Sequence, residues 1–166
     1  MTNREFCIAR RKAELPAFRR VLRALPEARL DYRPDEKSKT AAQLAGVLIE
    51  EEGALAAVIE TGRVEWTRQP PFTNVADMVA AYERNHMLTT ERLERVSEAD
   101  WGKPVTFVIG GMPDWVQPMS DFVWLFLFDA VHHRGQLSTY LRPMGGKVPS
   151  IYGPSADDPM MATAKE

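Results

Sequence analysis

The chain has 166 residues, 45% of them hydrophobic and 27% charged, which fits one globular domain and argues against disorder. Lys and Arg number 21 against 23 Asp and Glu, and the resulting net charge of -2 removes the usual electrostatic reason to expect a nucleic-acid partner. The longest strongly apolar run, residues 122–128, is far too short to span a bilayer core of about 30 Å.

The chain contains a single cysteine, Cys7, so no intrachain disulfide can form. This usage fits a reducing compartment, and an isolated thiol of this kind is expected to be packed rather than reactive. We therefore expect one cytoplasmic domain over residues 1–166, with no nucleic-acid and no membrane partner.

Apolar residues recur between residues 6 and 25 with nearly a 3.6-residue period, which predicts a first helix with basic residues on its other face. The expected inward positions are Phe6, Ala9, Ala13, Phe18, Val21, Leu22 and Leu25. Pro16 either begins a second helical segment or kinks one long helix. Residues 26–39, which include Pro34 and many charges, are expected to form a surface connection.

A second helix is expected from about Thr40 to Thr61, with Gly62 as its C-terminal cap. Its apolar stripe consists of Leu44, Val47, Leu48, Leu55, Val58 and Ile59. After a Pro-Pro loop, Asn74 can cap a third helix that runs to about residue 96. The inward residues of that third helix are Val75, Val79, Tyr82, Leu93 and Val96.

The segment 98–118 contains a short apolar run, residues 105–109, followed by two glycines. This run permits a brief extended segment or hairpin, but we do not expect a sheet. A fourth helix is expected from about Ser120 to Met144, and the tail from Lys147 onward should be irregular. Four helices with one apolar stripe each bury those stripes most simply in an all-α four-helix bundle.

Acidic and imidazole side chains interrupt the apolar stripes of two of these helices. Glu51 falls among aliphatic positions of the second helix, where an ionised carboxylate is costly unless a cation, a metal or a hydrogen-bond donor meets it. Asp129 and His133 lie four residues apart on the inward face of the fourth helix, so both can reach one ion. This donor set suits a divalent transition metal such as Zn, Ni, Fe or Mn, with positions left open for water or substrate.

Other roles for these polar residues remain open. Glu51, Asp129 and His133 can instead form a buried hydrogen-bonded network, with or without Arg134, that fixes the helix register and binds nothing. His132 is rotated about 100° from its neighbour and is expected in a packing or interface role. His86 on the third helix is a possible substitute ligand, although a satisfied core histidine is the more ordinary interpretation.

Two stretches of the sequence resemble DinB/YfiT-like proteins. The run from His132 to Leu137, followed by residues 141–146 and 148–149, looks like the signature of the last bundle helix in that family. Residues 25–44 are similar to the segment that leads into the family's second helix. The resemblance implies a bundle with up-down-down-up helix directions. It also implies a divalent metal held by three histidines, one from the second helix and a His-x-x-x-His pair from the fourth.

The match to that histidine set is partial. His133 corresponds to the second histidine of the pair, Asp129 replaces the first, and Val47 occupies the position of the second-helix histidine. Glu51 lies one turn beyond Val47 on the same face, so Glu51, Asp129 and His133 together can replace the three histidines as ligands and catalytic residues.

The activities found in that family suggest two alternative functions for this chain. Some relatives are transferases that use low-molecular-weight thiols, some are hydrolases, and homodimers are common. We therefore expect a metal-dependent transferase or hydrolase that acts on a small molecule, such as a low-molecular-weight thiol, as a homodimer. The alternative is a non-catalytic dimeric relative that has lost its metal and serves a binding or stress-response role.

Overall fold

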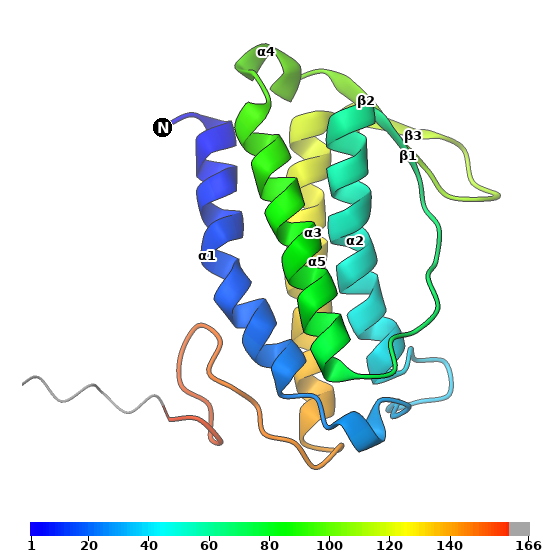
Figure 1. Ribbon diagram of the computed structural model, residues 1–166, viewed down its shortest axis with the longest axis vertical. Helices are drawn as coiled ribbons and strands as arrows, with labels where there is room; N and C mark the ends of the chain where they lie inside the picture. Colours follow the sequence, from blue (N-terminus) through cyan, green and yellow to red (C-terminus); the bar gives the residue numbers. More distant parts are fainter. Residues whose placement is uncertain (160–166) are drawn as a thin grey trace, which may run out of the picture.

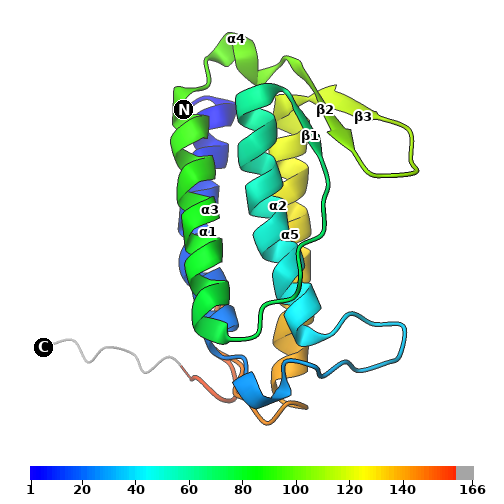
Figure 2. The ribbon, with the colours of Figure 1, turned by 45° about the vertical axis from the view of Figure 1, so that its right-hand side comes forward.

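Four long helices lie side by side in the computed structural model, which describes residues 1–159 (Figure 1). They are α1 (Asn3–Arg23), α2 (Ala41–Thr61), α3 (Val75–Arg95) and α5 (Met119–Leu141). A short helix, α4 (Glu98–Trp101), and a single turn, η1 (Glu27–Arg29), lie in the connections. Helices α1 and α5 run in one direction and α2 and α3 in the other, which is the order of directions that the resemblance implies (Figures 1 and 2).

The helix ends follow the capping signals of the sequence. Thr2 and Thr40 each form a capping box, in which their side chains accept from the backbone N–H three residues on. Asn74 caps α3 by accepting from the N–H of Asp77. Helix α2 ends at Gly62, whose φ of 73° is accessible to glycine at little cost. The predicted second helix is therefore confirmed at both ends.

The first turns of α1 bury a different face from the one we predicted. Phe6 is 47% exposed, and Ala9 and Ala13 are also exposed, whereas Cys7 and Arg11 are buried. The apolar pattern was misleading because an arginine that meets a buried acid can occupy a core position. The helix continues without interruption through Pro16, so no second segment begins there.

The prediction that Cys7 is packed is confirmed. The residue has no exposed surface, and burial raises the pKa of its thiol to about 11. Because the thiolate is the reactive species, this thiol is expected to be inert at neutral pH.

A three-stranded sheet at one end of the helices corrects the expectation of an all-α fold with no sheet. Its strands are β1 (Arg63–Glu65), β2 (Pro104–Val108) and β3 (Trp115–Pro118), in the order β1-β2-β3. Strands β2 and β3 form an antiparallel hairpin, and β1 pairs in parallel with β2. Each strand is short, and the parallel pairing joins segments far apart in the sequence, so the local pattern could not reveal it. The mostly helical character is confirmed.

The sheet packs on the same helices that carry the polar residues. Val105 and Phe107 point from β2 into a core cluster with Phe122 and Phe126 of α5. A second apolar cluster fills the space between the long helices towards their other end. Within residues 1–159, no helix is both long enough and apolar enough to cross a membrane. Residues 147–159 contain no helix or strand, as expected, and the rest of the tail lies outside the described residues.

Candidate metal centre

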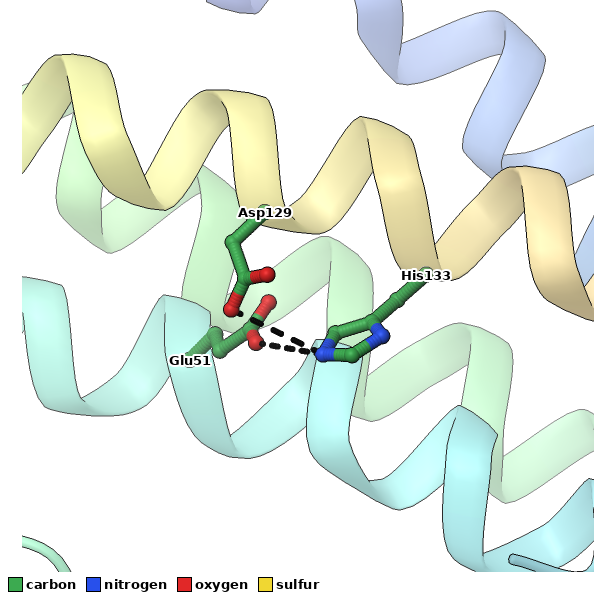
Figure 3. A group of neighbouring side chains, drawn as sticks. All are labelled: Glu51, Asp129 and His133. Atoms are coloured by element: carbon green, nitrogen blue, oxygen red, sulfur yellow. Dashed lines mark ion pairs between the residues drawn. The ribbon is translucent and has the colours of Figure 1, made fainter. Parts of the chain in front are cut away.

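Three side chains from two helices converge at one point between α2 and α5 (Figure 3). Glu51 comes from α2, and Asp129 and His133 come from successive turns of α5. One ligand atom from each lies within 4.8 Å of the other two. His133 Nε2 is 3.4 Å from Glu51 Oε1 and 3.6 Å from Asp129 Oδ2. The structure thus brings together the three residues that the sequence selected.

The group is buried on one side and open on the other. Glu51 is 5% exposed, and among residues 1–159 its Oε2 atom has no hydrogen-bond partner. The side chain of His133 is 16% exposed and that of Asp129 is 49% exposed. A buried carboxylate oxygen without a partner is unusual, and two carboxylates with one imidazole form a donor set that a divalent ion can satisfy. The residues present therefore fit a metal with positions left open.

Electrostatics at Glu51 favour a bound cation. The pKa of Glu51 is raised from 4.5 to about 10, mainly by burial, then by the charge of Asp129 and a hydrogen bond with its side chain, with smaller effects from Glu52 and Glu50. With no cation present, the acid therefore holds its proton at neutral pH. A divalent ion in contact with the carboxylate favours the ionised form, so metal binding here is coupled to proton release.

His133 is oriented by a neighbour on its own helix. Its Nδ1 lies 3.2 Å from Gln136 Oε1, and because that oxygen can only accept, Nδ1 carries the hydrogen. The lone pair of His133 is then on Nε2, which faces the two carboxylates. The Gln136 amide nitrogen lies 2.9 Å from Nε2 of the exposed His132, to which it can donate. Such partners commonly set the tautomer of a metal-binding histidine.

Replacing Gln136 with alanine should weaken metal binding by about ten- to a hundredfold, because His133 loses the acceptor that fixes its ring. Gln136→Glu keeps an acceptor at the same reach and should retain most of the affinity. His132→Ala removes only an exposed acceptor of the amide and serves as the control. Competition with a chromophoric chelator measures all three variants, and equal affinities for Gln136→Ala and wild type would show that the hydrogen bond plays no part.

The buried histidine His86 belongs to a different cluster. Its Nδ1 lies 3.4 Å from Glu52 Oε1, and Glu52 Oε2 accepts from Arg11 at 2.6 Å. Burial alone would raise the pKa of Glu52, but the Arg11 guanidinium and His86 outweigh it, so the pKa lies below its ordinary value. His86 is therefore a core histidine with a partner, the more ordinary of the two interpretations. Local sequence patterns did not indicate Arg11 and Glu52 as its neighbours.

Arg134 also lies away from the three site residues. It is buried, donates to Glu14 of α1 and to the Tyr152 hydroxyl, and stacks over the Phe18 ring. The alternative prediction of a network that includes Arg134 with Glu51, Asp129 and His133 is therefore wrong about Arg134. Arg134 instead joins α1, α5 and the C-terminal segment.

A cavity of about 630 Å³ adjoins the three residues. Glu51, Asp129 and His133 lie in its lining, and so does Val47, the position where the resemblance places a histidine. Much of the remaining lining comes from the sheet and from the segment between α2 and α3, which local sequence patterns did not place near the site. The lining residues that the sequence did not indicate include Lys39, Trp66, Arg68, Phe107, Trp115 and Phe126.

Comparison with known proteins supports the resemblance. The model of the DinB family matches residues 11–165, and the chain therefore belongs to the DinB family. No curated protein sequence matches the chain.

Solved structures show the same fold. A DinB-like protein from Bacillus cereus ATCC 10987 superposes with a TM-score of 0.75 at 18% identity, over 89% of this chain and 97% of the other. A DinB-like protein from Bacillus subtilis gives 0.66 at 17% identity, over 84% and 91%. A mutant of mycothiol-dependent maleylpyruvate isomerase gives 0.59 at 12% identity, over 90% of this chain and 63% of the isomerase. At these identities the likeness concerns the fold.

Proposed function

We propose that this DinB-family protein is a metal-dependent enzyme in which Glu51, Asp129 and His133 hold a divalent ion beside the cavity. The observation that carries the proposal is the Glu51 carboxylate, which is buried, faces an imidazole and a second carboxylate, and has one oxygen without a partner among the described residues. A closed structural network would be expected to satisfy that oxygen. The mixed oxygen and nitrogen donors are compatible with Zn, Ni, Fe or Mn.

The three side chains have distinct tasks in this proposal. A bound divalent ion supplies Lewis acidity, which lowers the pKa of a water or thiol in contact with it. Glu51 is fixed between the helices and would hold such an ion permanently, while Gln136 keeps Nε2 of His133 aimed at the same point. Asp129 is half exposed at the cavity, so its carboxylate would be the group placed to accept a proton from a water or thiol.

The reaction class is transfer to a low-molecular-weight thiol or hydrolysis. The structural relative named as a mycothiol-dependent isomerase supports a thiol as the nucleophile. Both reactions require that the small molecule reach the centre, and the adjoining cavity supports such access.

A non-catalytic family member is the second candidate, and one observation favours it. Val47 lines the cavity where the resemblance places a metal-binding histidine, so the three-histidine set that the resemblance implies is incomplete. Homodimer formation stays a prediction of the resemblance. The half-exposed Phe6 and the exposed Phe128, both in ring contact with Trp124, form an apolar surface that would support it.

Metal analysis of protein purified without chelator tests the proposal. Wild type should carry about one equivalent of a divalent transition metal per chain, and an Asp129→Ala, His133→Ala double variant should carry about a tenth of that or less, because two of three ligands are lost. The matched control is Asp121→Ala with His132→Ala, which removes an exposed acid and an exposed histidine from the same helix. Negligible metal in both wild type and the double variant would contradict the enzyme proposal.

A further inference from the structure

One end of the cavity beside the candidate centre is aromatic. Trp66 begins the connection from β1 to α3, Phe107 and Trp115 face each other across the β2-β3 hairpin, and Phe126 lies on α5. Ring centroids lie 5.7 Å apart for Trp66 and Phe107, 5.3 Å for Phe107 and Phe126, and 6.4 Å for Phe107 and Trp115. These rings offer a continuous apolar surface to an occupant of the cavity.

The same cavity is also lined by two cationic side chains. Lys39 directly precedes the N-cap of α2, and Arg68 lies in the segment between β1 and α3. Both are exposed, and within residues 1–159 neither side chain forms an ion pair or a hydrogen bond. The nearby acid Glu50 is already engaged, because its Oε1 accepts from the backbone N–H of Gln69 at 2.7 Å. The two cations are therefore available to an external anion.

The metal-binding residues lie between Lys39 and the rings. Helices α2 and α5 run in opposite directions (Figure 2), and Phe126 precedes Asp129 by about one turn on α5. On α2, Lys39 precedes Glu51 by about three turns, which corresponds to about 18 Å along the helix axis. A molecule that touches the rings and Lys39 while passing the centre must therefore be elongated.

We infer that the substrate is an elongated amphipathic anion whose apolar or aromatic part packs against the rings and whose carboxylate or similar group pairs with Lys39. Arg68, whose neighbour Gln69 bonds to Glu50, adds a positive charge along the same cavity. This inference rests on the proposed function, because only a reacting centre makes the occupant a substrate. Burial of an apolar group against the rings and a charge-assisted hydrogen bond to Lys39 supply the affinity, and the charge of Arg68 favours an anion over a neutral ligand. The atom that reacts lies between the two ends, beside Asp129 and His133.

Binding of chemically matched probes to the full chain in the presence of a chelator tests the ligand class without the metal. The anionic probes are phenylbutyrate and the longer phenyloctanoate, and phenylbutanol and phenylbutylamine are the neutral and cationic counterparts. Calorimetry measures the affinity of each. At least one of the two acids should bind about tenfold or more tightly than the alcohol or the amine, since one charge-assisted contact accounts for about a factor of ten. Amine or alcohol binding as tight as that of both acids would overturn the inference.

Variants locate the two ends of the site. A Lys39→Ala, Arg68→Ala double variant should lose about tenfold or more in affinity for the acid while its affinity for the alcohol changes about twofold or less. The control variant Lys37→Ala, Arg84→Ala removes the same charges from exposed positions outside the lining and should bind like wild type. Trp66→Ala should weaken the acid and the alcohol alike. Unchanged acid binding in the Lys39, Arg68 variant would contradict the assignment of the cationic end.

The enzyme proposal and the inferred ligand class can each be contradicted without the other. Selective acid binding with no metal in the purified protein would support the ligand class and contradict the enzyme. A full equivalent of metal with no preference for the acids would leave the centre in place and overturn the ligand class.

Discussion

Replacing Glu51 with glutamine should stabilise the metal-free protein at neutral pH and remove most of the stabilisation that a divalent ion gives to wild type. Glutamine has the shape of the protonated acid and carries no ionisable group. In metal-free wild type, the buried carboxyl must either hold a proton or place an unmatched charge beside Asp129. The substitution therefore removes a cost in one condition and a metal ligand in the other.

The pH dependence of this effect has a definite sign. The pKa of Glu51 is raised from 4.5 to about 10, so between these values the folded chain holds a proton that the unfolded chain has released. The free energy of unfolding of wild type therefore falls with rising pH in this window, by about 1.4 kcal/mol per pH unit from this group. Below pH 4.5 the two states bind the proton equally, and the stability contributed by the raised pKa is fully present.

Urea denaturation in the presence of a chelator at several pH values measures this difference. The stability of the Glu51→Gln variant minus that of wild type should grow by about 3 kcal/mol between pH 5 and pH 7. Glu36→Gln, at an exposed acid, is the control and should track wild type. With metal at about a hundred times its Kd, wild type gains about 2.7 kcal/mol and the variant much less. A difference that does not vary with pH would contradict the buried, protonated state of Glu51.

The candidate site could be found in the sequence because it breaks a local pattern. A charged residue in an aliphatic stripe, such as Glu51, needs a partner, and two polar residues four apart, such as Asp129 and His133, share one helix face. Both arguments use only neighbours within one helix. Convergence of the two helices then follows from the bundle, and the structure supports it.

Glu52 could not be found in the same way because α2 is buried on more than one stripe. The helix packs against α3 and α5 and also meets the sheet, so its buried residues cover a wide arc that includes both Glu51 and Glu52. A prediction based on one apolar stripe assigns adjacent residues to different faces. The burial of Arg11 depends in turn on Glu52, a contact between helices that leaves no trace in the periodicity of either one.

The cavity escaped prediction for a related reason. Trp66 and Phe107 meet because β1 pairs in parallel with β2, and neither strand is long enough to show an alternating pattern. The sequence therefore indicated the candidate metal-binding residues but not the walls of the adjoining cavity.

Disrupting the buried ion pair between Arg11 and Glu52 should cost about 3–5 kcal/mol when one partner is removed. In the Arg11→Met variant, Glu52 loses the guanidinium that lies 2.6 Å away and remains in a buried position beside His86. Its charge is then uncompensated, and the chain must either protonate the acid or admit water. Urea denaturation of Arg11→Met should show this loss directly.

Replacing both partners should restore much of the lost stability. Arg11→Met combined with Glu52→Leu removes both charges and keeps apolar volume, so the double variant should be more stable than Arg11→Met alone. A matched cycle on Lys12 and Glu94, an exposed pair that joins α1 to α3, should give a coupling of about 1 kcal/mol or less. Losses in the buried cycle that simply add would contradict a direct pair.

The metal content of the Arg11→Met, Glu52→Leu variant shows whether the buried pair only stabilises the fold or also positions the candidate metal ligands. Glu52 ties α2 to α1 and α3, while its neighbour Glu51 faces α5. If the buried pair only adds stability, the double variant should bind metal like wild type once it is folded. If the pair fixes the rotation of α2, metal affinity should fall even though the fold is restored. We expect the second result, because two adjacent acids that point to different helices constrain how far α2 can turn.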